Sequence, residues 1–234
     1  MRHRRRGVTL IEVLVALALV TLLTGGMMMG MGALTSARLR EGSTLIMAAV
    51  NAAYNHANAT SRATRVVIDF GTRTVAIEDS PGRMLLQSGS RTGGAASATE
   101  LERAASEEAE AIVEGPRAPR AEFRAVTNLL GFSSDKSKAA VKTLPDGVYF
   151  RQVEVEHEDT PATEERVYVY FWPGGQTERA AIQLQKGNAD AAADDIMTLT
   201  IAPLTGKVRM FNGALEMARP RSDEEASERE DFGF

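Results

Sequence analysis

The sequence predicts an α+β protein in which one long N-terminal helix packs on a domain of two antiparallel β-sheets. An apolar run of helical length occupies residues 8–34, and an amphipathic helical pattern continues it over residues 35–62. Short alternating patterns, separated by glycine and proline turns, then recur over residues 63–217. We therefore expect a helix whose first half lies in a membrane and whose second half packs on a β-rich domain.

Composition limits the chemistry open to the chain. Its 234 residues suffice for one sizeable core with appendages, and the absence of cysteine excludes disulfides, cysteine zinc sites and thiol nucleophiles. The net charge is −4, with arginines concentrated in residues 2–6 and acidic side chains in residues 223–231. This balance disfavours nucleic-acid binding by the chain as a whole.

Residues 8–34 are long enough to span a membrane, since a helix needs about 20 apolar residues to cross the hydrocarbon core. Positive charge is denser before this run than after it, where Arg38 and Arg40 lie beside Glu41. The N-terminus is therefore expected in the cytoplasm and the C-terminal domain across the membrane. A secretory signal peptide would have a shorter apolar core and a small-x-small cleavage site, so we expect a retained single-pass helix.

Glu12 is the one carboxylate inside the apolar run. A charge in a membrane segment costs about 2.5 to 3.5 kcal/mol on insertion scales, so such a residue usually has a partner or a function. One interpretation is that Glu12 lies at the headgroups and benefits from the positive end of the helix dipole. The other is a functional contact, and the residues around Glu12 favour it.

The segment "GVTLIE" at residues 7–12 resembles the prepilin motif of type IV pilins and type II secretion pseudopilins. In that family a peptidase cuts after the glycine, and the fifth residue of the mature chain is glutamate. The resemblance implies that residues 1–7 form a cytoplasmic leader, that Val8 becomes the N-methylated first residue after cleavage at Gly7, and that the apolar helix is retained. The family's usual first residue is phenylalanine, whereas this chain has Val8.

Cleavage after Gly7 would create a cationic amine at Val8, which Glu12 of a neighbouring subunit can neutralise within an apolar bundle. Such a buried pair sets the subunit register more than it adds stability. Further along, Gly26 and Gly30 form a small-xxx-small spacing that lets membrane helices pack closely.

The following residues alternate as strands. Residues 65–70 and 74–79 form a predicted hairpin, and residues 146–157 change phase near Arg151 and Gln152, which indicates a bulge. Residues 166–172 are apolar on both faces and predict a central strand, with Tyr168, Tyr170 and Trp172 as packing residues rather than a binding stripe.

Residues 178–185 predict a half-exposed strand, and residues 195–201 predict a strand with threonines on one face. A turn over residues 203–206, with Gly206 in the left-handed conformation, leads into a last strand at residues 207–211.

Two segments differ in composition from the strands. Residues 88–120 form a variable insert rich in Gly, Ala, Ser and Glu, where Ser97 and Glu100 predict the capped start of a surface helix. Residues 218–234 are predicted to be an acidic, disordered tail.

The order of these elements resembles the GspH/FimT class of minor pseudopilins and minor pilins, whose soluble domain packs two antiparallel sheets on the helix. The segment "LTGKV" at residues 204–208 matches the closing turn and strand of that class. The resemblance covers residues 60–80 and 140–212, and the insert and tail have no counterpart in it.

Nothing in the sequence supports an enzyme, a metal centre or a cofactor site. It contains no G-x-S-x-G elbow and no P-loop. His3 would be lost with the leader, and His56 and His157 are expected to be isolated surface residues. An acidic cluster could ligate calcium but lacks EF-hand spacing, so a solvated loop is favoured. Its members are Asn188, Asp190, Asp194 and Asp195.

The resemblance implies a minor pseudopilin of a type II secretion system, a structural subunit near the tip of the pseudopilus that drives export of folded proteins across the outer membrane. The implied partners are prepilin peptidase, other major and minor pseudopilins, the inner-membrane assembly platform and secreted substrates. The implied location is the inner membrane, with the C-terminal domain in the periplasm.

Two other functions compete with this one. A FimT-like minor pilin of a type IV pilus, acting in DNA uptake, would need a basic patch near the end of the chain. Only four basic residues support such a patch, namely Lys207, Arg209, Arg219 and Arg221. A signal-anchored periplasmic hydrolase would need a nucleophile constellation, and the sequence shows none.

Overall fold

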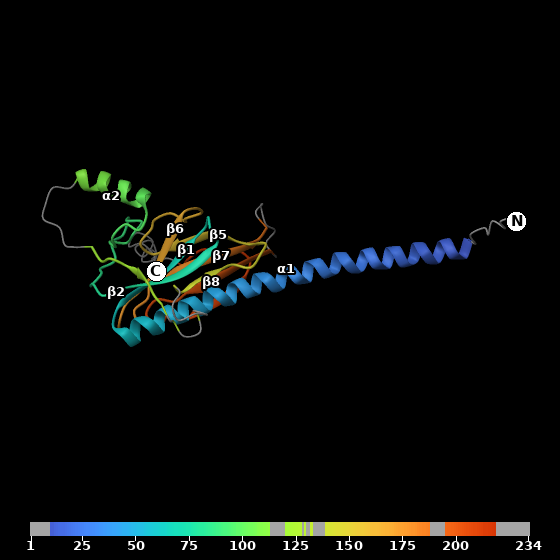
Figure 1. The fold of residues 1–234 in the computed structure, drawn as a ribbon, viewed down its shortest axis with the longest axis horizontal. Helices are drawn as coiled ribbons and strands as arrows, with labels where there is room; N and C mark the ends of the chain where they lie inside the picture. The colour runs from blue at the N-terminus through green and yellow to red at the C-terminus, as the bar shows by residue number, and fades with distance from the viewer. Residues whose placement is uncertain are drawn as a thin grey trace, which may run out of the picture.

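The computed structural model describes residues 10–112, 120–127, 129, 132, 139–187 and 195–218, and at residues 24–35 and 109–112 it describes the helical backbone alone. A long helix, α1 (Leu10–Thr60), extends from a β domain with a second short helix, α2 (Glu100–Ile112) (Figure 1). The strands follow in chain order as β1 (Ala63–Asp69), β2 (Thr74–Ser80), β3 (Arg124–Ala125), β4 (Val141–Thr143), β5 (Val148–Val155), β6 (Arg166–Phe171), β7 (Ala180–Lys186), β8 (Ile196–Ile201) and β9 (Val208–Asn212).

Helix α1 is continuous over 51 residues, as the sequence predicts, and its two halves differ in burial. In the second half the buried side chains recur at steps of three and four residues, which is the spacing of one helix face. They are Ile46, Ala49, Val50, Ala53 and Ala57, all with 0% exposure. From Leu10 to Leu23 every side chain is exposed. Among the residues whose side chains are described, no helix has an apolar stretch long enough to cross a membrane.

The β domain consists of two antiparallel sheets, which confirms the predicted fold class. The first sheet has the order β3-β2-β1-β6, with β4 also paired to β2, and the second has the order β5-β7-β8-β9. The predicted hairpin is β1 paired with β2, with Val66 opposite Ile77. The predicted bulge lies in β5, where the register with β7 shifts between Phe150 and Gln152.

One apolar core lies between α1 and the inner faces of both sheets. Small residues on α1 permit this close approach. At Gly42 an added Cβ would lie 3.3 Å from Cγ1 of Val148, which is tighter than ordinary packing. At the far end of the core, Gly206 has a φ of 60°, as predicted, and an added Cβ would lie 2.6 Å from Cδ2 of Tyr54. Gly206 is therefore restricted to glycine by its positive φ and by Tyr54 of α1, whereas a side chain at position 42 would require Val148 to shift.

Two strand predictions are wrong in part. Strand β6 is buried on both faces, but it ends its sheet and pairs only with β1 among the described strands. Strand β7 is central rather than half-exposed, and Ala181 and Gln183 on its outer face are buried. The reason is that residues 213–218 fold back over this face. The amide of Gln183 donates to the carbonyl of Leu215, and Thr198 donates to that of Gly213.

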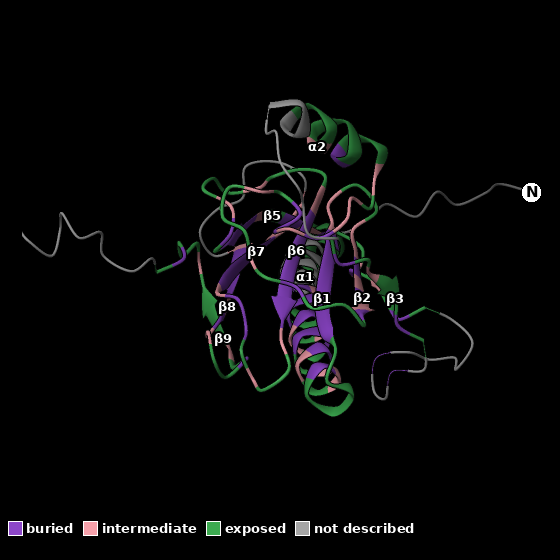
Figure 2. Cartoon of the chain, turned by 90° about the vertical axis from the view of Figure 1, so that its left-hand side faces the viewer, coloured by how far each residue is buried: buried purple, intermediate pink, exposed green. Residues whose placement is uncertain are grey.

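The outer face of the first sheet is covered by residues 81–112 and 120–123, which we call the covering segment. It contains α2, which lies at the surface as predicted (Figure 2). The cap differs from the prediction, because Thr99 rather than Ser97 caps the helix. The hydroxyl of Thr99 accepts from the amide of Glu102, and the carboxylate of Glu102 accepts from the amide of Thr99, which forms a capping box.

Three members of the acidic cluster for which a solvated loop is favoured over calcium binding, Asn188, Asp190 and Asp194, lie outside the described residues, and so do residues 219–234. Asp195 is described and pairs with Nζ of Lys186 at 3.2 Å. In the described ranges no group of three or more His, Cys, Asp or Glu side chains has the geometry of a metal site.

Candidate functional site

The predicted processing and assembly site lies at the start of α1. Gly7 and Val8 lie outside the described residues, and Glu12 lies in the first helical turn with its side chain exposed. A carboxylate at this position is stabilised by the positive end of the helix dipole. Gly26 and Gly30 both lie within α1, four residues apart.

Apolar side chains surround Glu12 on all sides of the helix. Leu10 is 78% exposed and Ile11 is 70% exposed, and exposed leucines and valines continue to Leu23. Successive residues point in different directions around a helix, so the apolar surface covers the whole circumference rather than one stripe. An apolar surface of this extent marks contact with lipid or with other subunits.

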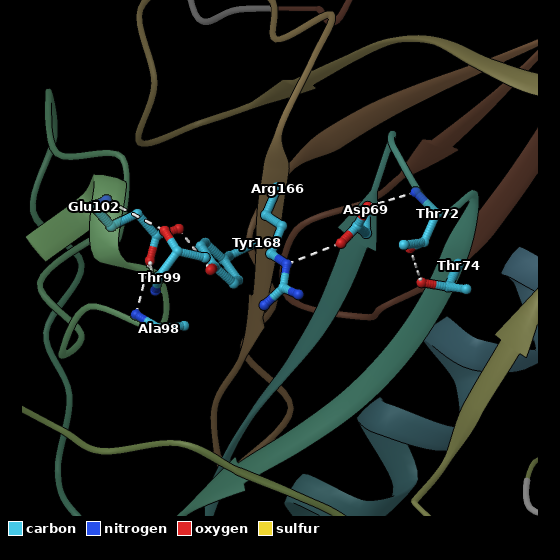
Figure 3. Close-up of polar contacts among 8 residues, drawn as sticks. All are labelled: Asp69, Thr72, Thr74, Ala98, Thr99, Glu102, Arg166 and Tyr168. Carbon is cyan, nitrogen blue, oxygen red and sulfur yellow. Dashed lines mark hydrogen bonds and ion pairs between the residues drawn. The ribbon is translucent and has the colours of Figure 1, made fainter.

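A second cluster of functional groups is buried between the first sheet and the covering segment. The carboxylate of Glu102 accepts hydrogen bonds from the hydroxyl of Tyr168 at 2.6 Å and from the amide of Ala98 at 2.8 Å (Figure 3). Tyr168 on β6 is fully buried, and Glu102 is 6% exposed. Burial and the negative charge of Glu102 raise the pKa of Tyr168, so the phenol stays protonated and acts as the donor. This contact ties the start of α2 to the sheet.

Arg65 on β1 lies beneath the same segment and is 1% exposed. Its guanidinium carbon lies 4.1 Å from the ring centroid of Tyr168 and 4.4 Å from that of Phe123, and the group pairs with Glu78 at 2.7 Å. Burial alone lowers the pKa of Arg65, but the tyrosines and Glu78 outweigh it and the net shift is upward. A cation between two ring faces and one carboxylate holds the covering segment through Phe123.

The prediction that His157 is a surface residue is wrong. Its side chain is fully buried, and Nδ1 bonds to the buried carboxylate of Glu178. Nε2 lies 3.4 Å from the carbonyl of Arg91 in the covering segment. Burial alone lowers the pKa of His157, but the hydrogen bond and charge of Glu178 outweigh it, so the pKa is raised above 6.5. The strand pattern predicts β5 but not the loop that folds over its end.

His56 is not isolated either, since Nε2 lies 2.9 Å from the carboxylate of Asp79. The aromatic residues of β6 are packing residues, as predicted. Tyr170 donates to the carbonyl of Thr92, and Nε1 of Trp172 donates to the carbonyl of Met84. Gly93 has a φ of 56°, and an added Cβ there would lie 2.9 Å from Tyr170, so the loop lies close against the ring.

Comparison with known families identifies only the predicted processing and assembly site at the start of α1. The model of the prokaryotic N-terminal methylation motif matches residues 2–28, a range that includes Gly7, Val8 and Glu12. No curated protein and no solved structure matched the chain.

The motif and the fold together define the class of protein. A long N-terminal helix packed on antiparallel sheets is a pilin-like fold, and the methylation motif is typical of type IV pilins and pseudopilins. The chain combines a pilin-like fold with the methylation motif, and proteins of this kind are structural and generally not enzymes. The motif implies processing by prepilin peptidase and a precursor anchored in the inner membrane.

Proposed function

We propose that this chain is a minor pseudopilin of a type II secretion system, a structural subunit near the tip of the pseudopilus that drives export of folded proteins across the outer membrane. The observation that supports it is the methylation motif at the start of a helix with two different surfaces. The first half exposes apolar side chains on every side, and the second half buries one face against the β domain. The first half of such a helix can leave the lipid and pack into a bundle of helices, while the β domain remains outside the membrane.

The chemistry of assembly follows from the first residues. Peptidase cleavage after Gly7 releases the leader and creates the amine of Val8, which is then methylated. Glu12 of a neighbouring subunit neutralises this amine. One lone charge of either sign would be costly in the bundle, whereas the pair nearly cancels that cost. Gly26 and Gly30 let adjacent helices approach closely.

The proposed partners are the other major and minor pseudopilins, the inner-membrane assembly platform and the secreted substrates. Before assembly, residues 8–34 would span the inner membrane once, with the leader in the cytoplasm and the β domain in the periplasm. The charge difference across the apolar run supports this orientation.

A second candidate is a FimT-like minor pilin that acts in DNA uptake. Lys207 and Arg209 lie with Arg179 along a groove of about 430 Å³ beside β9, which offers cations to a phosphate backbone. Glu216 in the same groove opposes this function. Binding of duplex DNA to the full-length protein at physiological salt, lost in Lys207→Glu, would favour this candidate.

The main proposal is tested by the mass of the protein extracted from membranes, together with the variant Glu12→Val. We expect a mature chain that begins at methylated Val8. We expect Glu12→Val to insert in the membrane and be processed, but not to enter filaments, and secretion to fall with the loss of assembly. Filaments are measured by shearing and immunoblotting, and secretion by protein in the culture medium.

Glu41→Val is the matched control, because Glu41 is an exposed carboxylate on the same helix outside the motif. It should assemble like the wild type. An unprocessed chain that begins at Met1, or normal assembly of Glu12→Val, would refute the proposed role of the motif. Normal secretion with lost DNA uptake in a strain lacking the chain would favour the second candidate.

A further inference from the structure

An arginine-rich groove lies at the end of the domain where α1 stops and β2 ends. It encloses about 580 Å³ and collects four arginines from three separate segments. Arg62 lies between α1 and β1, Arg83 follows β2, and Arg120 and Arg124 lie just before and within β3. All four are exposed, so the groove is open to a large partner.

The carboxylates in this groove do not cancel its positive charge. Asp79 is already engaged by His56 at 2.9 Å and by Arg62 at 3.4 Å. Glu122 reaches Arg124 at 3.8 Å, and both side chains are more than three-quarters exposed, so this pair is weak. Arg83 forms no ion pair with any described residue. Arg83 without an ion pair to a described residue, beside the exposed and weak pair of Arg124, leaves positive charge for an anionic partner.

The chain itself contains a segment of the complementary charge. Residues 222–231 carry six carboxylates, which are Asp223, Glu224, Glu225, Glu228, Glu230 and Asp231. Guanidinium groups bind carboxylates in a bidentate manner, which gives such contacts direction as well as charge. This segment begins four residues after Ala218, which is the last described residue.

Ala218 lies on the opposite side of the domain from the groove. Its carbonyl accepts from the guanidinium of Arg179 at 2.6 Å, beside the strands of the second sheet. The groove lies at β3 and the end of β2, and Figure 2 shows β3 and β9 at opposite edges of the β domain. A groove on one side of a subunit and a segment that follows a residue on the other side permit a head-to-tail contact between two copies.

We propose that the arginine-rich groove binds the acidic C-terminal segment, residues 222–231, of a second copy of this chain. The contact rests on the proposed function only in requiring that copies meet on one assembly, and it is independent of the methylation motif. Each exposed pair is weak, so the contact depends on several pairs at once and is sensitive to salt.

Binding is measured with the full-length protein in detergent micelles and a fluorescent peptide of residues 219–234. We expect saturable binding that weakens with salt and falls about ten-fold or more in the double variant Arg83→Glu/Arg124→Glu, since each reversal replaces attraction with repulsion. Arg151→Glu is the matched control, because Arg151 is an exposed arginine on β5 outside the groove. A peptide with all carboxylates replaced by amides should not bind.

Disulfide cross-linking separates binding between copies from binding within one copy, because the chain has no cysteine of its own. We expect a mixture of full-length Arg83→Cys and Glu225→Cys proteins to form a cross-linked dimer, and a mixture of Arg151→Cys and Glu225→Cys not to do so. A disulfide formed only within one chain of the double variant Arg83→Cys/Glu225→Cys would overturn the proposal. Tighter binding of a DNA duplex than of the peptide would also overturn it, in favour of nucleic acid.

These readouts do not require leader cleavage or filament formation, and Glu12→Val should leave them unchanged. A failure of the groove proposal therefore leaves the proposed function intact. If Glu12→Val assembles normally while the cross-link forms, the role of the motif fails and the groove contact stands.

Discussion

The two faces of the first sheet are both buried, but they are covered by different means. On the inner face, α1 packs aliphatic side chains such as Ile46 and Val50 against Val66 and Val169. On the outer face, the covering segment packs over Tyr168 and Tyr170, and many of its contacts are hydrogen bonds from side chains to main-chain groups. Strands β1 and β6 thus contribute one face to an apolar core and the opposite face to a polar layer.

The two kinds of contact predict different responses of the two layers to mutation. Hydrophobic burial is non-directional and scales with the area and volume removed from water, so damage to the inner face should weaken the whole domain. Hydrogen bonds and ion pairs are directional and local, so damage to the outer face should release the covering segment and leave the core in place. Four predictions, in decreasing order of their effect on stability, test this contrast.

Ile46→Ala should lower the free energy of unfolding by about 2 to 5 kcal/mol, because Ile46 is fully buried in the inner core and its truncation leaves a cavity. Ile11→Ala is the matched control on the same helix, since Ile11 is 70% exposed, and it should leave that free energy unchanged. Chemical denaturation of both full-length variants in detergent measures the effect. Equal losses in the two variants would contradict the division of α1 into two surfaces.

Tyr168→Phe should destabilise the covering segment by about 1.5 to 3 kcal/mol, because it removes the donor to the buried carboxylate of Glu102. Hydrogen exchange should rise in residues 98–108 and stay low in β7. Tyr149→Phe is the control, because Tyr149 contacts Arg73 through its ring and no described group bonds to its hydroxyl. A uniform rise of exchange through the core would show that the two layers fail together.

The attachment of the covering segment should weaken as the pH rises. Since the pKa of His157 is higher in the folded state than its ordinary 6.5, protonation stabilises the fold. That stabilisation is complete below about pH 6.5 and is lost as the pH rises through the folded-state pKa. The free energy of local opening at residues 87–96, obtained from hydrogen exchange corrected for intrinsic rates, should fall with pH.

His157→Gln tests the origin of this slope, because glutamine does not titrate. The variant should lose the component above pH 6.5 and retain any component from Glu158, whose pKa burial raises above its ordinary 4.5. An unchanged slope in His157→Gln would assign the pH dependence to another group.

Thr99→Ala should have the smallest effect, a loss of about 1 kcal/mol in the local stability of α2, because it removes one half of the capping box. Ser97→Ala is the comparison that separates the observed cap from the one predicted from the sequence. It should cost less, since the hydroxyl of Ser97 contacts that of Ser106 at 3.5 Å and caps no helical amide. Helix content by circular dichroism and exchange in residues 100–104 measure both variants.

Much of the fold could be predicted because it depends on local patterns. The seven- and four-residue spacing of Leu39, Ile46 and Val50 predicts the buried helix face, and the alternation around Gly71 predicts the β1–β2 hairpin. The bulge in β5 was visible as a change of phase. These features involve residues close together in the chain, where spacing alone determines which side chains share a face.

The errors concern contacts between distant segments. Gln183 looked exposed because its strand alternates, yet residues 213–218 cover it. His157 looked isolated, yet Glu178 and Arg91 meet it from other segments. Ser97 and Glu100 have the spacing of a capping box, as do Thr99 and Glu102, and in the fold it is Glu102 that bonds to both Thr99 and Tyr168. A pattern in the sequence does not say which remote segment will cover a face.

The methylation motif, the apolar first half of α1 and the acidic run at residues 223–231 can be read without a fold, because each is a property of consecutive residues. Tertiary structure alone decided the polar layer beneath the covering segment and the arginine-rich groove. Arg62, Arg83 and Arg124 are far apart in the chain and unremarkable one by one. They form a site only because the ends of β1, β2 and β3 meet at one end of the sheet. Like charges held together there attract a partner of opposite charge.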